Sequence, residues 1–249
     1  MAFCELHFFS RALGKQTAAN VIVPQDAAAG RFPVFYLLHG LSDDHTAWIR
    51  RTSLERYLDG LQLIVVMPDG GRGFYTDAAE GFAYESAIVQ DLVPFIDATF
   101  YTRAERSGRC IGGLSMGGYG ALKLALKFPE LFCSATSHSG ALTKGHVRRE
   151  QETPELDRIF GPDARGGPND LFALAEKIDR AKLPAMRIDC GTEDSLLDRS
   201  RAFHAHLEQL GIKHEYAEYA GGHDWRYWDA RIIEALAFHR RHLREIMLV

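Results

Sequence analysis

The chain has 249 residues, a length that can bury one large core and that often forms a single α/β domain. Its 46% hydrophobic and 25% charged residues are typical of a globular protein. The formal net charge of -4 gives no basic field for nucleic acid, and no apolar run approaches the length of a membrane span. We therefore expect neither a nucleic-acid partner nor a membrane partner.

The pattern of strands and helices predicts a doubly wound α/β fold. An antiparallel hairpin is expected first, from Cys4 to Ser10 and from Thr17 to Val23. Six buried strands are expected near Val34–Leu38, Leu63–Met67, Cys110–Leu114, Phe132–Ser137, Met186–Cys190 and Lys213–Tyr219. Helices alternate with these strands, and two of them have apolar residues at helical spacing, Leu196–Leu210 and Trp225–Leu243. We expect a mostly parallel sheet with helices on both faces.

The segment Gly113-Leu114-Ser115-Met116-Gly117 carries the Gly-x-Ser-x-Gly motif. An apolar strand pattern precedes it and a helical pattern follows it, which is the context of a nucleophile elbow. The sharp turn exposes the serine hydroxyl, and glycines on both sides avoid collisions with the strand and helix. The alternative is a glycine-rich turn that only packs a helix on a strand. We predict that Ser115 is a nucleophile.

A serine nucleophile needs a base, and the base needs a group that fixes its tautomer. In hydrolases with this elbow the chain order is Ser, then Asp or Glu, then His. Asp194 follows one strand pattern in Gly191-Thr192-Glu193-Asp194, and His223 follows the next in Gly222-His223-Asp224. Both positions lie just beyond the carboxyl end of a strand, where open α/β sheets place their ligands. We predict Asp194 as the acid and His223 as the base.

Other acids and histidines fit these roles less well. Asp189 lies inside a strand pattern and is expected to face a helix or solvent, whereas Glu193 is expected to cap a turn. Asp198 falls in the first turn of a helix, where a carboxylate favours the helix dipole, and Asp224 adjoins the histidine it would have to orient. The histidines on helical patterns are expected to be solvated or packed: His204, His206, His239 and His242.

An oxyanion hole requires two backbone donors near the nucleophile. The buried strand Val34–Leu38 ends in His39-Gly40-Leu41-Ser42, and an N–H of this loop can converge with that of the residue after the nucleophile. We predict Leu41 and Met116 as the two donors. The alternative for His39-Gly40 is an ordinary strand-ending turn.

One segment departs from the alternation of strands and helices. Residues 141–183 are rich in charge, Pro and Gly and contain one helix-like stretch, Leu171–Ile178. We expect one domain over 1–249, with a cap-like excursion at about 141–183 that shapes the acyl or alcohol pocket.

Five separated motifs, in order from about Val34 to Trp228, resemble the esterase D-like α/β-hydrolase family. They are Tyr36-Leu37-Leu38-His39-Gly40, Val65-Val66-Met67-Pro68-Asp69-Gly70, Gly113-Leu114-Ser115-Met116-Gly117-Gly118-Tyr119-Gly120, Cys190-Gly191-Thr192-Glu193-Asp194 and Gly222-His223-Asp224-Trp225. The chain most resembles small bacterial tributyrin-esterase-type carboxylesterases. The resemblance implies a serine carboxylesterase with Ser115, Asp194 and His223 as its catalytic triad and no cofactor.

We therefore expect hydrolysis of small, short-chain acyl esters through an acyl-enzyme. The superfamily leaves open a thioesterase of the S-formylglutathione hydrolase type, an acetyl or feruloyl esterase acting on carbohydrate esters, and acyl transfer to an alcohol. Gly73-Phe74-Tyr75 resembles the formylglutathione branch, although the surrounding residues depart from it. A catalytically dead homologue that binds a ligand or partner is the non-enzymatic alternative.

Location and assembly follow less directly from the sequence. The first residues include an early acid, Glu5, and no apolar signal core, so we expect a cytoplasmic protein. No metal is expected because the four cysteines lack metal-site spacing: Cys4, Cys110, Cys133 and Cys190. The sequence does not decide whether the chain forms a homo-oligomer.

Overall fold

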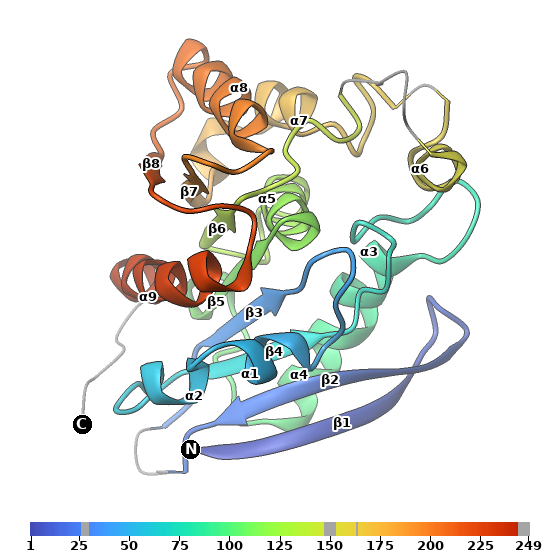
Figure 1. Cartoon of the computed structure of the whole chain (residues 1–249). Coiled ribbons are helices and arrows are strands. Elements are labelled where there is room, and N and C mark those ends of the chain that lie inside the picture. Colours follow the sequence, from blue (N-terminus) through green and yellow to red (C-terminus); the bar gives the residue numbers. More distant parts are fainter. Residues whose placement is uncertain (26–29, 147–152, 163, 244–249) are drawn as a thin grey trace.

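A computed structural model describes residues 1–25, 30–146, 153–162 and 164–243. Its centre is an eight-stranded sheet with the order β1-β2-β4-β3-β5-β6-β7-β8 (Figure 1). The strands are β1 Ala2–Ser10, β2 Lys15–Val23, β3 Val34–Leu38, β4 Ile64–Pro68, β5 Arg109–Leu114, β6 Ser134–His138, β7 Ala185–Gly191 and β8 Glu215–Tyr219. All eight predicted strands are present, with boundaries shifted by two residues or fewer.

The sheet is antiparallel at one end and parallel elsewhere. β1 pairs antiparallel with β2, and β2 pairs antiparallel with β4. From β4 through β3, β5, β6 and β7 to β8 every pair is parallel. The prediction of a mostly parallel sheet with an N-terminal antiparallel hairpin is therefore confirmed. Because the parallel strands share one direction, the loops after β3, β5, β7 and β8 meet at one edge.

Helices cover both faces of the sheet, as predicted. On one face of the sheet, an apolar cluster packs the strands against α4, α5, α7 and α8. On the other face, a second apolar cluster packs them against α1, α2 and α9. The α-helices are α1 Ala47–Arg51, α2 Leu54–Tyr57, α3 Tyr84–Ser86, α4 Val93–Thr99, α5 Met116–Lys127, α6 Pro154–Phe160, α7 Leu171–Lys177, α8 Leu197–Gln209 and α9 Trp225–His242. A π-helical turn, η2 Ala87–Leu92, joins α3 to α4, and two 3₁₀ turns occur at η3 Arg106–Gly108 and η4 Arg180–Lys182. No helix among the described residues is long and apolar enough to cross a membrane.

The excursion at 141–183 contains more helix than its sequence indicated. The predicted stretch at Leu171–Ile178 forms α7, but α6 was missed. Residues 147–152 and 163 lie outside the described residues, and the assignment of 1–249 to one domain stays a prediction. α6 is only seven residues long, and its position depends on contacts with residues about 80 positions earlier, which local patterns do not reveal.

A buried ion pair links α3 to α5 below the active-site edge. The Nζ of Lys123 is fully buried and lies 2.6 Å from Oε2 of Glu85, whose other oxygen lies 2.6 Å from Nζ of Lys127. Burial lowers the pKa of Lys123 to about 8, although the Glu85 charge opposes that shift. The ammonium therefore depends on Glu85 to remain charged inside the protein.

We expect Glu85→Gln to lower the free energy of unfolding by about 3 kcal/mol, because Lys123 loses its counter-charge and must either stay charged without it or give up a proton. Urea denaturation at pH 7 measures this change, and Glu130→Gln on the exposed surface is the matched control. A loss below about 1 kcal/mol would show that water reaches Lys123.

Candidate active site

Ser115 lies in the turn between β5 and α5 with a φ of 53° and a ψ of -115°. A positive φ is strained for a residue with a side chain, so the surrounding turn has to hold it in place. The two glycines explain how the turn closes. A Cβ on Gly113 would lie 2.6 Å from the backbone carbon of Gly117, and one on Gly117 would lie 2.4 Å from the carbonyl oxygen of Leu38. The predicted strand-turn-helix context is therefore present.

The structure brings the three predicted triad residues into hydrogen-bond contact. Nε2 of His223 lies 3.0 Å from Oγ of Ser115, and Nδ1 of His223 lies 2.8 Å from Oδ2 of Asp194. These residues follow β5, β7 and β8. The imidazole side chain is 31% exposed, whereas the Asp194 side chain is fully buried. The site is therefore open to a substrate on the side of the serine and histidine.

The Asp194 carboxylate is stabilised in its charged form. Burial raises its pKa, but hydrogen bonds from His223 and from the backbone N–H of Leu196 outweigh burial and bring the pKa below its ordinary value. The Leu196 N–H lies 2.7 Å from Oδ1 of Asp194. That bond leaves Oδ2 for the imidazole and fixes which side of the carboxylate faces it.

The remaining acids occupy other positions. Glu193 is exposed, and Asp198 is exposed in the first turn of α8. Asp224 caps α9, because its Oδ1 accepts hydrogen bonds from the N–H groups of Arg226 and Tyr227. Asp189 is buried and accepts a hydrogen bond from Tyr227 of α9, so of the two expected surroundings, a helix or solvent, the structure shows a helix.

The loop after β3 lies against the nucleophile. A Cβ on Gly40 would come 3.7 Å from Cβ of Ser115 and 2.8 Å from Cδ1 of Leu114, so a larger residue would have to displace the Leu114 side chain. Leu41 is the next residue of that loop, and Met116 is the first residue of α5. An N–H in the first turn of a helix has no partner within the helix and is free to bind an anion.

The loop after β3 is held by two residues to which the sequence assigned no role. The hydroxyl of Tyr75 accepts from the N–H of His39 at 3.0 Å and donates to its carbonyl oxygen at 3.1 Å. The His39 ring bridges Gly40 O and Gly70 N, at 2.7 and 2.9 Å. Tyr75 reaches this position because Phe74 and Tyr75 both adopt a φ near 50°, which turns the chain sharply. No short-range pattern encodes a contact that spans 36 residues.

We expect Tyr75→Phe to lower kcat about tenfold with little change in KM. The variant keeps the packed ring but loses both hydrogen bonds to His39, so the loop that carries the predicted Leu41 donor is held less firmly. Hydrolysis of a p-nitrophenyl ester measures kcat and KM, and Tyr101→Phe on the surface is the control. An unchanged kcat would mean that packing alone positions the loop.

A second set of contacts that the sequence did not predict supports His223 and the turn at Ser115. The ring of Trp228 meets that of His223 edge-on, with ring centres 5.0 Å apart. His138 at the end of β6 accepts the Ser115 N–H on its carbonyl oxygen at 2.9 Å, and its Nδ1 lies 2.9 Å from the buried carboxylate of Asp189. Tyr227 of α9 donates to the same carboxylate. A buried polar network therefore joins β6, β7 and α9 below the triad.

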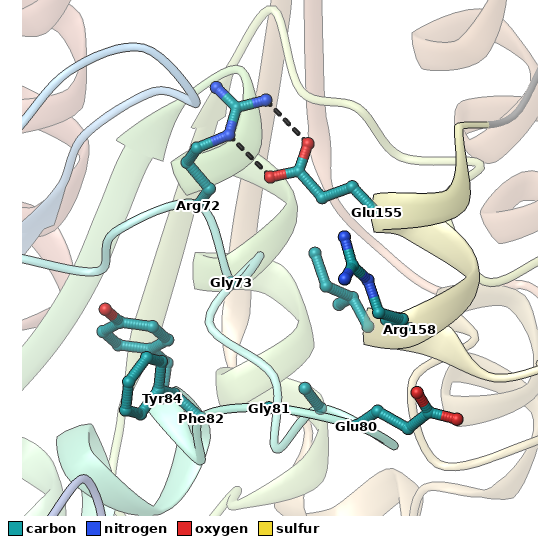
Figure 2. A pocket seen from close by; sticks show the side chains of 10 residues that line it. Arg72, Gly73, Glu80, Gly81, Phe82, Tyr84, Glu155 and Arg158 are labelled. Carbon is teal, nitrogen blue, oxygen red and sulfur yellow. Dashed lines mark hydrogen bonds and ion pairs between the residues drawn. The ribbon is translucent and has the colours of Figure 1, made fainter.

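A separate pocket of about 430 Å³ lies between residues 72–84 and α6 (Figure 2). Arg72 and Glu155 form a two-point ion pair at its rim, with N–O distances of 2.6 and 2.8 Å. Phe82, Tyr84 and Arg158 also line it. None of the triad residues lines this pocket, so we do not assign it to the reacting centre.

One group of side chains among the described residues has the composition of a metal site. His204, Glu208 and His214 have ligand atoms within 4.8 Å of one another. The two histidines already contact each other, with Nδ1 of His204 2.7 Å from Nε2 of His214, and Glu208 is exposed. The group includes no triad residue, so nothing links it to the reaction.

Comparison with known proteins identifies the family. The model of a family described as putative esterase matches residues 10–239. The chain is 30% identical to an acetyl esterase of Caldicellulosiruptor saccharolyticus, over 94% of this chain and 97% of that protein. The chain belongs to this esterase family. The chain is also 34% identical to an esterase of Mycobacterium tuberculosis, which is a longer protein. The match covers 88% of this chain and 55% of that protein.

Solved structures agree with this family assignment. The chain matches an S-formylglutathione hydrolase of Staphylococcus aureus with a TM-score of 0.85 and 28% identity, over 96% of this chain and 98% of that one. A fluorophosphonate-binding serine hydrolase of the same organism gives a TM-score of 0.85 and 27% identity over the same shares. This esterase is thus a carboxylic ester hydrolase with the α/β-hydrolase fold, as its sequence predicted.

Proposed function

We propose that this esterase hydrolyses short-chain acyl esters, with Ser115 as nucleophile, His223 as general base and Asp194 as the residue that orients the imidazole. The observation that carries the proposal is the continuous hydrogen-bonded chain from Ser115 through His223 to Asp194. Its direction is fixed, because an ionised Asp194 only accepts hydrogen bonds and therefore requires the proton of His223 on Nδ1. Nε2 is then free to take the proton of Ser115.

The reaction follows from these positions. Oγ of Ser115 attacks the ester carbonyl carbon while Nε2 of His223 takes the hydroxyl proton, which gives a tetrahedral oxyanion. The oxyanion collapses and the C–O bond to the alcohol breaks as His223 returns its proton to the leaving oxygen. A water then attacks the acyl-enzyme with His223 again as base, which releases the acid and restores Ser115.

Two backbone N–H groups would stabilise the oxyanion, those of Leu41 and Met116. Support comes from the close approach of Gly40 to Ser115 and from the position of Met116 at the start of α5. Fixed donors of this kind stabilise the tetrahedral state by a few kcal/mol each because they need no reorientation during the reaction. The donors, the triad and water are sufficient for the proposed reaction.

The preference for soluble esters rests on how α6 is anchored. A lipase lid opens an apolar face at a lipid surface, whereas α6 is bound by the Arg72–Glu155 pair and by two backbone hydrogen bonds to residues 79 and 80. Phe160 at the end of α6 also packs edge-on against Phe74 and Tyr119. The sequence carries further charges just before α6, at Arg148, Arg149, Glu150 and Glu152, which lie outside the described residues. Opening α6 would break these contacts, and bringing its charged groups against lipid would be costly.

We expect acetyl to butyryl esters to be cleaved best, with decanoyl esters at least about tenfold slower. An apolar pocket gains about 0.8 kcal/mol per buried methylene only while there is room for the chain. Rates on p-nitrophenyl esters of increasing length, and on tributyrin below and above its solubility limit, measure this. Strong palmitoyl hydrolysis that begins only with an emulsion would instead identify a lipase.

Thioester hydrolysis is the second candidate function, because a similar protein of Staphylococcus aureus is an S-formylglutathione hydrolase. The same acyl-enzyme would form, and the leaving group would be a thiol. Comparing kcat/KM for an acetyl ester and for the matched thioester separates the two. A thioester preference above about a hundredfold would make this the main activity.

A further inference from the structure

β1 is an edge strand with an aromatic outer surface. It pairs with β2 on one side and is the last strand of the sheet among the described residues (Figure 1). Its residues alternate between partly buried and exposed positions, and the exposed ones are Phe3, Glu5, His7 and Phe9. Phe3 is 45% exposed and Phe9 is 58% exposed. A nine-residue edge strand with exposed aromatics offers unpaired backbone groups and apolar area to another strand.

The opposite edge of the sheet is protected. β8 is only five residues long, and its two glutamates form ion pairs with arginines of neighbouring elements. Glu218 pairs with Arg201, and Glu215 pairs with Arg187 and Arg241. Short length and charge are the usual means by which proteins prevent strand addition. β1 has neither.

We propose that β1 pairs antiparallel with β1 of a second copy of this chain, around a two-fold axis at Leu6, and so joins two sheets into one dimer. A two-fold axis perpendicular to the sheet places one residue opposite the same residue of the second copy. It also makes the exposed face of one sheet continuous with the exposed face of the other. With Leu6 at the axis, Phe3 lies opposite Phe9 of the second copy, and Glu5 lies opposite His7 of the second copy. Each exposed side chain thus meets a complementary one.

Neighbouring registers lack this complementarity. An axis at Glu5 sets two glutamates opposite each other, and an axis at His7 sets two histidines opposite each other and Glu5 opposite Phe9. Like charges in directly opposed positions destabilise a strand pair, whereas aromatic and opposite-charge pairs stabilise it by about 0.2–1 kcal/mol each. In the single chain Glu5 lies 3.2 Å from His7 of its own strand and 3.9 Å from Nε2 of His45, and pairing across the axis replaces the contact with His7.

The inner face of β1 fits the same register. Cys4, Leu6 and Phe8 are partly buried and pack against the main apolar cluster, where the ring of Phe8 stacks on Phe95. Pairing at Leu6 sets Leu6 against its own copy and Cys4 against Phe8 of the second copy. The apolar layer therefore continues across the two-fold axis without a buried charge.

Such a dimer leaves both candidate active sites open. Ser115 follows β5, the fifth strand from the β1 edge, and none of the triad residues lies on β1 or β2. Dimer formation is therefore expected to leave kcat/KM per subunit unchanged, so esterase activity reports whether a β1 variant is folded.

A register-specific disulfide tests the pairing. In Phe3→Cys/Phe9→Cys each new thiol lies opposite one on the second copy, within about 5 Å between Cβ atoms, so oxidation should give a covalent dimer in at least about 80% yield. Within one chain the same two thiols are about 20 Å apart and cannot bond. Phe3→Cys alone is the matched control, since its copy lies about 20 Å away across the axis. Equal crosslinking of the single and double variants, or none in either, would overturn the proposed register.

Sedimentation velocity tests the assembly itself. The unchanged chain should sediment as a dimer at micromolar concentration. Glu5→Lys should raise the dissociation constant of the dimer at least tenfold. Glu5→Lys/His7→Glu places opposite charges across the axis and should recover most of the loss. The proposal would be overturned if the chain were a fully active monomer at all concentrations. It would also be overturned if the chain were a dimer that Glu5→Lys leaves unchanged and in which Phe3→Cys/Phe9→Cys forms no disulfide. Neither result would affect the esterase assignment.

Discussion

Ser115→Ala should lower kcat/KM for acetyl and butyryl esters by at least about 10⁴-fold. Oγ of Ser115 is the only protein atom in the proposed reaction that forms a bond to the acyl group. Residues that act as a unit lose nearly the whole effect when one of them is removed. The residual rate would come from the oxyanion donors and substrate binding alone. The variant should stay folded, because the one hydrogen bond of Ser115 Oγ among the described residues is to His223, on the exposed side of the site.

The matched measurement is labelling by a fluorophosphonate, which bonds only to an activated serine. Mass spectrometry should locate the label on Ser115 in the unchanged chain and find none in Ser115→Ala. Ser107→Ala, at a serine in η3 whose hydroxyl donates to Glu105 two positions earlier, should keep both activity and label. Retention of a tenth of the activity in Ser115→Ala would remove Ser115 from the mechanism.

The predictable part of the site is the part encoded by local rules. The elbow at Ser115 requires a buried strand, two glycines and a helix within about fifteen residues, so its sequence is distinctive. Asp194 and His223 follow strands whose apolar patterns are short and clear, and the shared direction of parallel strands brings their loops to one edge. Chain order and topology therefore bring together residues that are 108 positions apart in the sequence.

The unpredicted part depends on contacts between distant residues that follow no local rule. Tyr75 supports His39 through its hydroxyl, and nothing in Gly73-Phe74-Tyr75 indicates a left-handed backbone at two residues with side chains. Asp189 is an acid within a strand pattern, and local reasoning could not show that Tyr227 and His138 would bind it. α6 was missed for the same reason, because the partner that anchors it, Arg72, lies in another loop.

Asp194→Asn should lower kcat by about 10⁴-fold with a much smaller change in KM. The amide keeps the size of the side chain, but its NH₂ group can donate to Nδ1 of His223 and favour the tautomer that carries its proton on Nε2. That tautomer cannot accept the proton of Ser115. The loss of negative charge also removes the stabilisation of the imidazolium that forms in the transition state.

Glu193→Gln is the matched control, because Glu193 is the exposed neighbour of Asp194 and carries the same charge. It should change kcat less than threefold, since its carboxylate is solvated rather than directed at the imidazole. Measuring kcat and KM for both variants on one butyryl ester distinguishes orientation of His223 from a general effect of charge near the site. A severe loss in Glu193→Gln together with a mild one in Asp194→Asn would transfer the role of the acid to Glu193, and the 2.8 Å contact between Asp194 and His223 would then be structural.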